Sequence, residues 1–347
     1  MFSALSTGTR IAQRSRTLFA RTCAHQAPRG MGKKKGPSEE ALSLPPHPSG
    51  TETPIIDTHT HLISTFGAYR QKYKDGQHET VFDFVKNMYA GRRVEAIVDV
   101  WCEAPVQRVW REIADSAVEA EDRERNWGGI EYWFVMGVHP HEAKLYNDDV
   151  ERDILEAMAH PRCVGWGEIG LDYHYDNSPR DTQREVFARQ LRQAVRLGKP
   201  LTIHTREADD DTERILKAEV PQDHRIHIHC FTDSPKFAQR LLAHFPDLYI
   251  GITGVVTYAT NENTANLLRA LAAQSDSPRF ILETDAPFMI PANIYTALPS
   301  MKGRLPLCHT AMIPWTAEFV ADVVGEGWST DRVMALGREN GRKMYGL

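Results

Sequence analysis

Histidine and carboxylate residues follow short, strand-like apolar runs at five places in the chain. They are Asp57-Thr58-His59-Thr60-His61, Gly167-Glu168-Ile169-Gly170-Leu171-Asp172, His204, His229 and Glu283-Thr284-Asp285-Ala286-Pro287. Imidazole and carboxylate groups are the usual protein ligands of zinc, manganese and related divalent cations. The pattern therefore predicts a metal centre formed where several strands end.

The spacing of these residues favours two ions over one. Side chains alternate along a strand, so His59 and His61 are expected to point the same way and to bind one ion together. Four imidazoles and two carboxylates are more than one ion needs if it keeps an open position. Two ions that share a bridging carboxylate would use all six, and such a pair promotes hydrolytic displacement at phosphorus or carbon. The six residues are His59, His61, Glu168, His204, His229 and Asp285.

Each of these residues alone has a simpler explanation. A single histidine at a strand end is more often a hydrogen-bonded structural residue than a ligand, and an aspartate before threonine or proline is often a turn residue. His227 also competes with His229, because the two face the same way, and we prefer His229 because it is nearer the loop. The metal hypothesis depends on all five strand ends acting together.

The elements that must position these residues alternate regularly from residue 54 onward. The expected strands are 54–57, 96–100, 132–136, 163–166, 201–203, 225–228, 248–252 and 280–282, with amphipathic helical patterns between them, for example in 181–197 and 235–245. Eight strand-then-helix units over about 290 residues predict an α/β protein with a (β/α)8 TIM barrel, whose active sites lie at the carboxyl ends of the strands. A doubly wound sheet is the alternative, but the sequence lacks the glycine-rich phosphate loop expected after an early strand.

Length and composition exclude several other classes of protein. The chain has 347 residues, of which 41% are hydrophobic and 25% charged, so it can bury a sizeable core. Its five cysteines form no C-x-x-C pair, which argues against a disulfide scaffold and favours a reducing compartment. No apolar run approaches 18 residues, so we expect no membrane-spanning helix.

The first 53 residues differ from the rest. Residues 1–30 are rich in Arg, Ser, Thr and Ala and contain no acid, which is typical of a mitochondrial targeting peptide. A disordered basic tail is the alternative, and translation from Met31 would give a shorter cytoplasmic or nuclear form. Residues 31–53, with four prolines, predict a disordered linker. The remaining residues, 54–347, form the predicted single catalytic domain.

The predicted domain is acidic. Residues 39–347 contain 33 basic and 46 acidic residues. An anionic substrate would therefore need a local positive site, such as bound metal ions, because the overall field would repel it.

At the residues above, the sequence resembles the TatD family of metal-dependent deoxyribonucleases, in the amidohydrolase-like group of barrels. The similar segments are 56–62, Gly137-Val138-His139-Pro140-His141, 165–173, 200–208, His229-Cys230-Phe231-Thr232, 249–254 and 282–287. They occur in the family order and extend over nearly all of 54–346. The combination is specific, although each segment alone is weak.

The resemblance implies roles for individual residues. His59, His61, Glu168 and Asp285 would bind the first ion, and Glu168 would bridge to a second ion held by His204 and His229. Asp285 would act as the base for the attacking water, with Glu168 as its catalytic partner. Three further residues would contact substrate or support the ligands: Arg206, suited to a phosphate, together with His139 and Asp172.

Three positions depart from the family pattern. Glu207 replaces the usual Asp after the Arg, and Asp233 replaces the usual Gly after His-Cys-Phe-Thr. The segment 303–309 replaces the expected Arg-Asn-x-Pro. None of these changes removes an implied ligand, but Asp233 adds negative charge near the mouth.

These observations predict a metal-dependent hydrolase with two divalent ions (Mg, Mn or Zn). The resemblance implies a 3′-to-5′ deoxyribonuclease whose partner is nucleic acid with single-stranded ends, because duplex must fray to enter a narrow barrel mouth. One alternative is an ester or amide hydrolase at the same site, such as a D-aminoacyl-tRNA deacylase, which suits the acidic surface. The other is a barrel that retains its ligands but acts as a binding protein.

Overall fold

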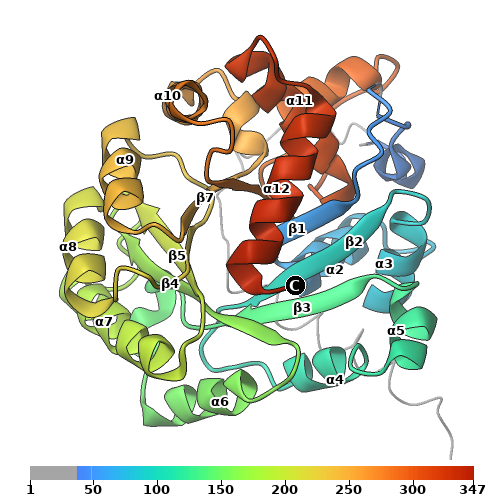
Figure 1. Ribbon diagram of the computed structural model, residues 1–347. Helices are drawn as coiled ribbons and strands as arrows, with labels where there is room; N and C mark the ends of the chain where they lie inside the picture. Colours follow the sequence, from blue (N-terminus) through green and yellow to red (C-terminus); the bar gives the residue numbers. More distant parts are fainter. Residues whose placement is uncertain (1–36, 48) are drawn as a thin grey trace, which may run out of the picture.

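The computed structural model describes residues 37–47 and 49–347, and the segment 1–30 lies outside them. Eight parallel strands form one sheet in the order β1 to β8, with helices around it (Figure 1). The strands are β1 (Ile55–Thr60), β2 (Val94–Trp101), β3 (Glu131–Met136), β4 (Cys163–Asp172), β5 (Leu201–Arg206), β6 (Ile226–Ile228), β7 (Leu248–Ile252) and β8 (Phe280–Leu282). The predicted TIM barrel is confirmed.

The helices lie between consecutive strands and after the last one. They are α2 (Leu62–Lys72), α3 (Val81–Met88), α4 (Val109–Asp115), α5 (Ala120–Trp127), α6 (Asp148–Met158), α7 (Arg180–Leu197), α8 (Asp209–Glu219), α9 (Pro235–His244), α10 (Glu262–Gln274), α11 (Ile313–Val324) and α12 (Thr330–Tyr345). Short 3-10 helices are η1 (Glu39–Ser43), η2 (Pro140–Leu145), η3 (Gly254–Thr257), η4 (Ala292–Ala297) and η5 (Thr310–Met312). In the described residues, no helix is both long and apolar enough to cross a membrane.

The barrel closes where β8 meets β1. The backbone N–H of Asp285 donates to the carbonyl of His59, and that of His61 donates to the carbonyl of Ala286, both at 2.9 Å. Buried Asp57 strengthens the same junction, because its carboxylate accepts from the backbone and hydroxyl of Thr284 at 3.0 and 2.7 Å. Asp57 therefore has a structural role beside the histidines that follow it.

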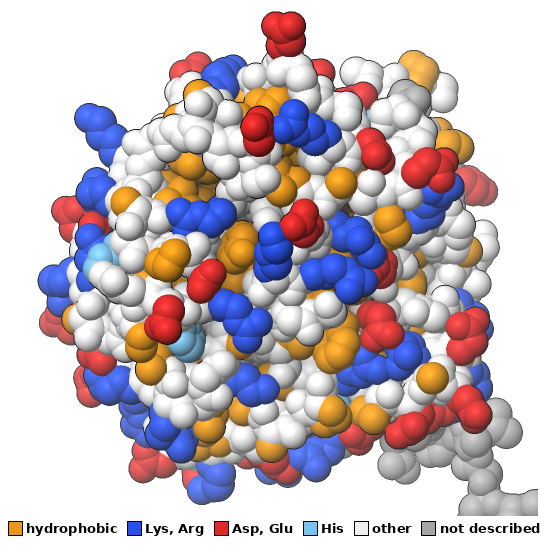
Figure 2. Space-filling view, viewed as in Figure 1, with side chains coloured by type: hydrophobic (Ala, Val, Ile, Leu, Met, Phe, Trp, Pro, Cys, Tyr) orange, Lys and Arg blue, Asp and Glu red, His pale blue; other side chains and the backbone are white. Residues whose placement is uncertain are grey.

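The end of the barrel seen in Figure 1 is filled by the C-terminal helix. Met344 and Tyr345 of α12 join an inner apolar cluster with Val98, Val135 and Ile281. Figure 2 shows the same side of the molecule, where Lys and Arg are interspersed with Asp and Glu and form no continuous basic stripe. The strands begin at this filled end, so the site at their carboxyl ends opens on the other side.

The described residues 37–47 and 49–53 differ from the disordered linker that the composition of 31–53 predicts. Residues 39–43 form η1, whose Leu42 is fully buried, and the carbonyl of Leu42 lies 3.0 Å from Nε2 of His309. The Arg92 guanidinium donates to the carbonyls of Ser43 and Leu44. These contacts fix a polar, proline-rich segment onto the barrel, because they satisfy backbone groups that local sequence patterns do not reveal. Residues 31–36 lie outside the described part of the chain.

Candidate metal centre

The six residues expected to bind metal lie together at the carboxyl end of the barrel. They come from five strands or the residues just after them: His59 from β1 and His61 just after it, Glu168 from β4, His204 from β5, His229 after β6 and Asp285 after β8. Three overlapping groups offer ligand atoms within 4.8 Å of one another: His59 with His229 and Asp285, His59 with His61 and Glu168, and His139 with Glu168 and His204.

A β-bulge positions Glu168 in the middle of this cluster. Gly167 pairs with Thr202 and Ile169 with the next residue, Ile203, so Glu168 is the extra residue in β4. A bulge redirects the side chain at that point of a strand. A second shift occurs in β1 between Asp57 and Thr60, around His59. Both irregularities lie at proposed ligands.

The two carboxylate oxygens of Glu168 face different histidines. Oε2 lies 3.5 Å from Nε2 of His59 and 3.6 Å from Nε2 of His61. Oε1 lies 2.8 Å from Nε2 of His229 and 2.9 Å from Nδ1 of His204. Glu168 thus stands between two sets of nitrogen atoms, as a bridging ligand must.

Asp285 completes the first set. Its Oδ1 lies 3.4 Å from Nε2 of His61 and 3.7 Å from Nε2 of His59. The backbone of Asp285 has φ +53°, a left-handed conformation that Asp tolerates better than most residues. This conformation and the bond of its N–H to His59 aim the carboxylate at the two histidines of β1.

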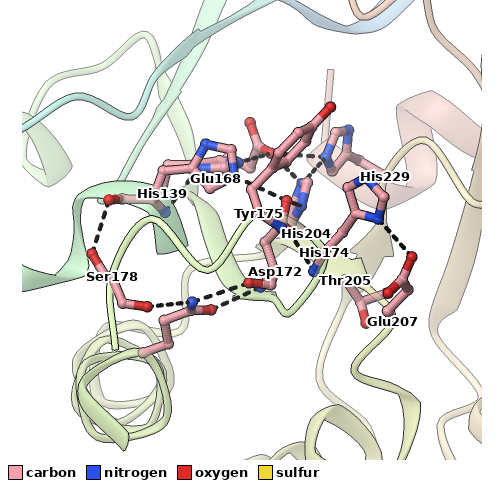
Figure 3. A network of polar contacts seen from close by, with 12 residues as sticks. His139, Glu168, Asp172, His174, Tyr175, Ser178, His204, Thr205, Glu207 and His229 are labelled. Carbon is pink, nitrogen blue, oxygen red and sulfur yellow. Dashed lines mark hydrogen bonds and ion pairs between the residues drawn. The ribbon is translucent and has the colours of Figure 1, made fainter. Parts of the chain in front are cut away.

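Asp172 and His139 lie beside the second set (Figure 3), and His141 contacts Asp172. Oδ2 of Asp172 lies 2.9 Å from Nε2 of His141 and 3.2 Å from Nε2 of His204. His139 places Nε2 at 3.3 Å from Oε1 of Glu168, while its Nδ1 accepts a hydrogen bond from the backbone of His141. That bond leaves the proton of a neutral His139 ring on Nε2, so His139 donates to Glu168 and supports the ligand.

Several buried polar atoms here have no hydrogen-bond partner among the described residues. They are both ring nitrogens of His59, Oε2 of Glu168 and Nδ1 of His229. Buried polar atoms without partners are costly, and native structures rarely leave them so. Cations bound between these nitrogen and oxygen atoms would satisfy most of them. The donor set therefore fits divalent metal ions.

The electrostatics of the cluster favour added positive charge. Burial opposes protonation of His61, but hydrogen bonding to Asp285 and the charge of Glu168 raise its pKa to about 9. Burial is likewise outweighed at His204, where Asp172 and Glu168 raise the pKa to about 9. The pKa of Glu168 lies well below its usual range because the surrounding histidines outweigh its burial. A divalent cation would benefit from the same negative field.

A second buried pair forms the floor beneath the cluster. Nε2 of His227 lies 2.8 Å from Oε2 of Glu283, and neither side chain is exposed. Nδ1 of His227 lies 2.8 Å from the hydroxyl of Tyr345 on α12. Gly251 in β7 makes room for the pair, because a Cβ there would lie 2.4 Å from both His227 and Glu283. His227 therefore belongs to the floor, and His229 lies in the cluster.

Arg206, which is expected to contact a substrate phosphate, lies at the mouth of the site. Its guanidinium carbon lies 5.0 Å from the ring centre of Tyr175, and no carboxylate of the described residues forms an ion pair with it. Glu207, one of the departures from the family pattern, pairs instead with His174 at 2.6 Å. Burial and the neighbouring Asp209 raise the pKa of Asp233 to about 7, which reduces the negative charge expected there.

Sequence reasoning missed three contributors. His141 lies in the family-like segment 137–141, but the sequence pattern predicts no role for it. The pattern predicts none for Tyr175 either. Asp99 accepts from the backbone of Leu62 at 2.8 Å and from Tyr132 at 2.9 Å, which anchors the segment after His61. An aspartate within the apolar run 96–100 is the one signal that could have revealed it.

Comparison with known proteins gives a consistent family match. A family model described as TatD related DNase matches residues 56–346. The 3′-5′ RNA nuclease TATDN2 of Homo sapiens is 39% identical over 216 residues, which are 62% of this chain and 27% of TATDN2. This chain thus matches only about a quarter of that relative's length. The uncharacterized metal-dependent hydrolase YabD of Bacillus subtilis (strain 168) is 30% identical over 294 residues, 84% of this chain and 98% of YabD.

A further relative and two solved structures agree. The 3′-5′ ssDNA/RNA exonuclease TatD of Escherichia coli (strain K12) is 32% identical over 194 residues, 56% of this chain and 71% of that protein. An uncharacterized amidohydrolase from Saccharomyces cerevisiae has a TM-score of 0.67 at 18% identity, over 84% of this chain and 100% of the other. YJJV, a TatD homologue from E. coli K12, has a TM-score of 0.64 at 20% identity, over 84% of this chain and 98% of YJJV. At these identities the solved structures support the fold alone.

Proposed function

The chain belongs to the TatD related DNase family, and from this premise we propose that it is a metal-dependent nuclease. It would hydrolyse phosphodiester bonds of single-stranded DNA or RNA from the 3′ end. The 3′-5′ nuclease names of TATDN2 and of E. coli TatD support this direction and substrate. The observation that carries the proposal is the position of Glu168 between two sets of histidines.

We expect two divalent ions in this site. His59, His61, Glu168 and Asp285 would hold one, and Glu168, His204 and His229 would hold the other. When bound, such ions act as Lewis acids toward the scissile phosphate and the attacking water. Four imidazole ligands favour zinc or manganese, whereas magnesium prefers oxygen ligands. Metal analysis of the protein purified without added metal checks this choice.

The chain's own residues would supply the rest of the reaction. The Asp285 carboxylate is ionised, since hydrogen bonding from His61 and nearby histidines outweigh burial and lower its pKa. This carboxylate can therefore accept a proton from the attacking water. Arg206 would bind a substrate phosphate through its planar guanidinium. Asp172 and His139 would hold His204 and Glu168 in position.

The proposal is tested with a 5′-labelled single-stranded oligonucleotide, as DNA and as RNA, in the presence of manganese, zinc or magnesium. We expect a ladder that shortens from the 3′ end, loss of cleavage with EDTA, and loss of cleavage in Glu168→Ala. Glu156→Ala is the matched control, because Glu156 is exposed on α6 and pairs with Arg111. Cleavage that survives EDTA or Glu168→Ala would contradict the proposal. Deacylation of aminoacyl-tRNA without oligonucleotide cleavage would replace it with the ester hydrolase alternative.

Localisation to mitochondria is also a proposal, and it depends on residues 1–30, which lie outside the described part of the chain. Their basic, acid-free composition supports it. Import of the full chain into isolated mitochondria, compared with a chain that starts at Met31, tests it. Equal import of both chains would contradict it.

A further inference from the structure

Two exposed aromatic side chains lie near the candidate metal centre. Among the described residues, four large hydrophobic side chains are exposed, and the two aromatic ones are Tyr175 and Phe288, at 38% and 43%. Aromatic rings are costly to leave in water, so their exposure at one end of the molecule requires a reason. Each ring also follows a carboxylate of the site by three residues, Tyr175 after Asp172 and Phe288 after Asp285.

The two rings lie on opposite sides of the barrel mouth. Tyr175 follows β4 and Phe288 follows β8. In a closed sheet with the strand order β1 to β8, these two strands are four positions apart in either direction. The metal-binding groups therefore lie between the segments that carry the two rings.

The loop that carries Tyr175 is anchored to the site. Oδ1 of Asp172 accepts from the backbone N–H groups of His174 and Tyr175 at 3.0 and 2.9 Å. The Tyr175 ring packs edge-on against His141, with centroids 5.5 Å apart, and Figure 3 shows it beside the histidine network. The ring is thus held in position while part of it faces solvent.

The loop that carries Phe288 is equally fixed. The backbone N–H of Phe288 donates to the carbonyl of Asp285 at 3.0 Å, and Cys308 donates to the carbonyl of Pro287 at 2.9 Å. Gly254 lies so close to this loop that a Cβ would be 2.0 Å from the carbonyl oxygen of Met289. The exposed ring therefore extends from a constrained backbone, and little conformational entropy is lost when it binds a ligand.

Arg206 adds a charge to the aromatic surface on one side. Its guanidinium stacks near Tyr175, 5.0 Å from the ring centre. A planar cation next to an aromatic ring matches a nucleotide, which presents a phosphate next to an aromatic base. On the other side of the mouth, Phe288 offers a base an aromatic ring without a neighbouring cation.

We propose that Tyr175 and Phe288 stack unpaired nucleobases on the two sides of the phosphodiester that is cleaved. The inference rests on the proposed nuclease function and specifies its substrate as a strand with unstacked bases near its end. Every base has a π-face, so such stacking is tolerant of sequence and of the sugar. Bases paired in a duplex already stack on one another, so they cannot stack on these two rings unless the end of the duplex frays.

The experiment measures kcat/KM for single-stranded oligonucleotides that carry either normal or abasic nucleotides at the last two 3′ positions. We expect Tyr175→Ala and Phe288→Ala each to lower kcat/KM about 5- to 100-fold on the normal strand, mainly through KM. On the abasic strand the ratio of wild type to variant should shrink severalfold. Tyr175→Phe should retain most of the wild-type value, because it keeps the ring. Leu197→Ala is the control, because Leu197 is similarly exposed but ends α7, far along the chain from the site loops.

A binding measurement separates this inference from the proposed function. Oligonucleotides with 2-aminopurine near the 3′ end report stacking by fluorescence quenching, with or without cleavage. Quenching that depends on Tyr175 or Phe288, in a protein that cleaves no oligonucleotide, would show that the two rings stack bases but would reject the nuclease, and with it the position of these bases around a cleaved phosphodiester. Metal-dependent cleavage with equal loss on normal and abasic strands, or no effect of either alanine variant, would overturn the inference and leave the nuclease intact.

Discussion

Asp172 holds His204 by the ring nitrogen that points away from Glu168. Oδ2 of Asp172 lies 3.2 Å from Nε2 of His204, whereas Nδ1 of His204 lies 2.9 Å from Oε1 of Glu168. A proton on Nε2 would be donated to Asp172, which leaves the lone pair of Nδ1 facing the cluster. A carboxylate in this position fixes the tautomer and the orientation of a metal-binding imidazole.

Replacing Asp172 with asparagine should therefore weaken the second metal position. Asparagine keeps the shape but loses the charge that orients His204, and we expect metal affinity to fall about 10- to 100-fold. Titration of the metal-free protein against a fluorescent chelator measures this affinity. Asp176→Asn is the matched control, because Asp176 lies in the same loop but pairs with exposed Arg180. Equal affinity in Asp172→Asn and wild type would show that His204 is oriented by other contacts.

Metal binding should stabilise the fold, because several buried ligand atoms have no hydrogen-bond partner among the described residues. At a metal concentration 100 times the dissociation constant, one site adds about 2.7 kcal/mol to the free energy of unfolding. For a domain of about 300 residues that gain raises the melting temperature by roughly 4 °C. Differential scanning fluorimetry with manganese or zinc, then with excess EDTA, measures the change and its reversal. His59→Ala should lose most of the response, and an unchanged melting temperature in the wild type would refute the metal centre.

The sequence predicts the barrel and the neighbourhood of the site because both depend on periodicity. Alternating strand and helix patterns fix the order of elements, and parallel strands bring their carboxyl ends together. His59, His61, His204 and Asp285 could therefore be placed at one end of the barrel before any coordinates were known. The family resemblance adds the order of the motifs and the bridging position of Glu168.

The remaining features depend on contacts between distant residues. The bulge at Glu168 appears only when β4 is paired with β5. His227 and His229 have the same alternation in sequence, and the contacts of His227 with Glu283 and with Tyr345 of α12 assign it to the floor. Similarly, the composition of 31–53 predicts disorder, but the burial of Leu42 and the hydrogen bonds from Arg92 fix residues 42–44. Whether residues 1–30 act as a targeting peptide stays a prediction.

A methyl group at Gly251 should disturb the floor of the site. The Cβ of Gly251→Ala would lie 2.4 Å from both His227 and Glu283, which are closely packed, so overpacking should cost about 1–3 kcal/mol of stability. Urea unfolding measures the loss. Combining the change with His227→Ala removes the ring that the methyl group meets, so the double variant should lose less than the sum of the single losses. Additive losses would indicate that Gly251 acts through some other contact.

The contact between His309 and Leu42 should make stability depend on pH. His309 is buried, with Nε2 3.0 Å from the Leu42 carbonyl, and burial together with the charge of Arg92 lowers its pKa to about 4. The unfolded chain has a histidine pKa near 6.5 and so binds the proton more readily. The contribution of His309 is therefore complete above about pH 6.5, and up to about 3 kcal/mol is lost as the pH falls from 6.5 to 4.

His309→Gln isolates this effect, because glutamine can donate to the same carbonyl but does not titrate. Urea unfolding of both proteins between pH 8 and pH 4.5 gives the difference in their free energies of unfolding. We expect the wild type to lose stability relative to the variant as the pH falls below 6.5, with a constant difference between pH 7 and pH 8. A difference that stays constant over the whole range would mean that His309 accepts a proton in the folded state as easily as in the unfolded chain. The packing of Leu42 against the barrel would then have to open at low pH to admit water.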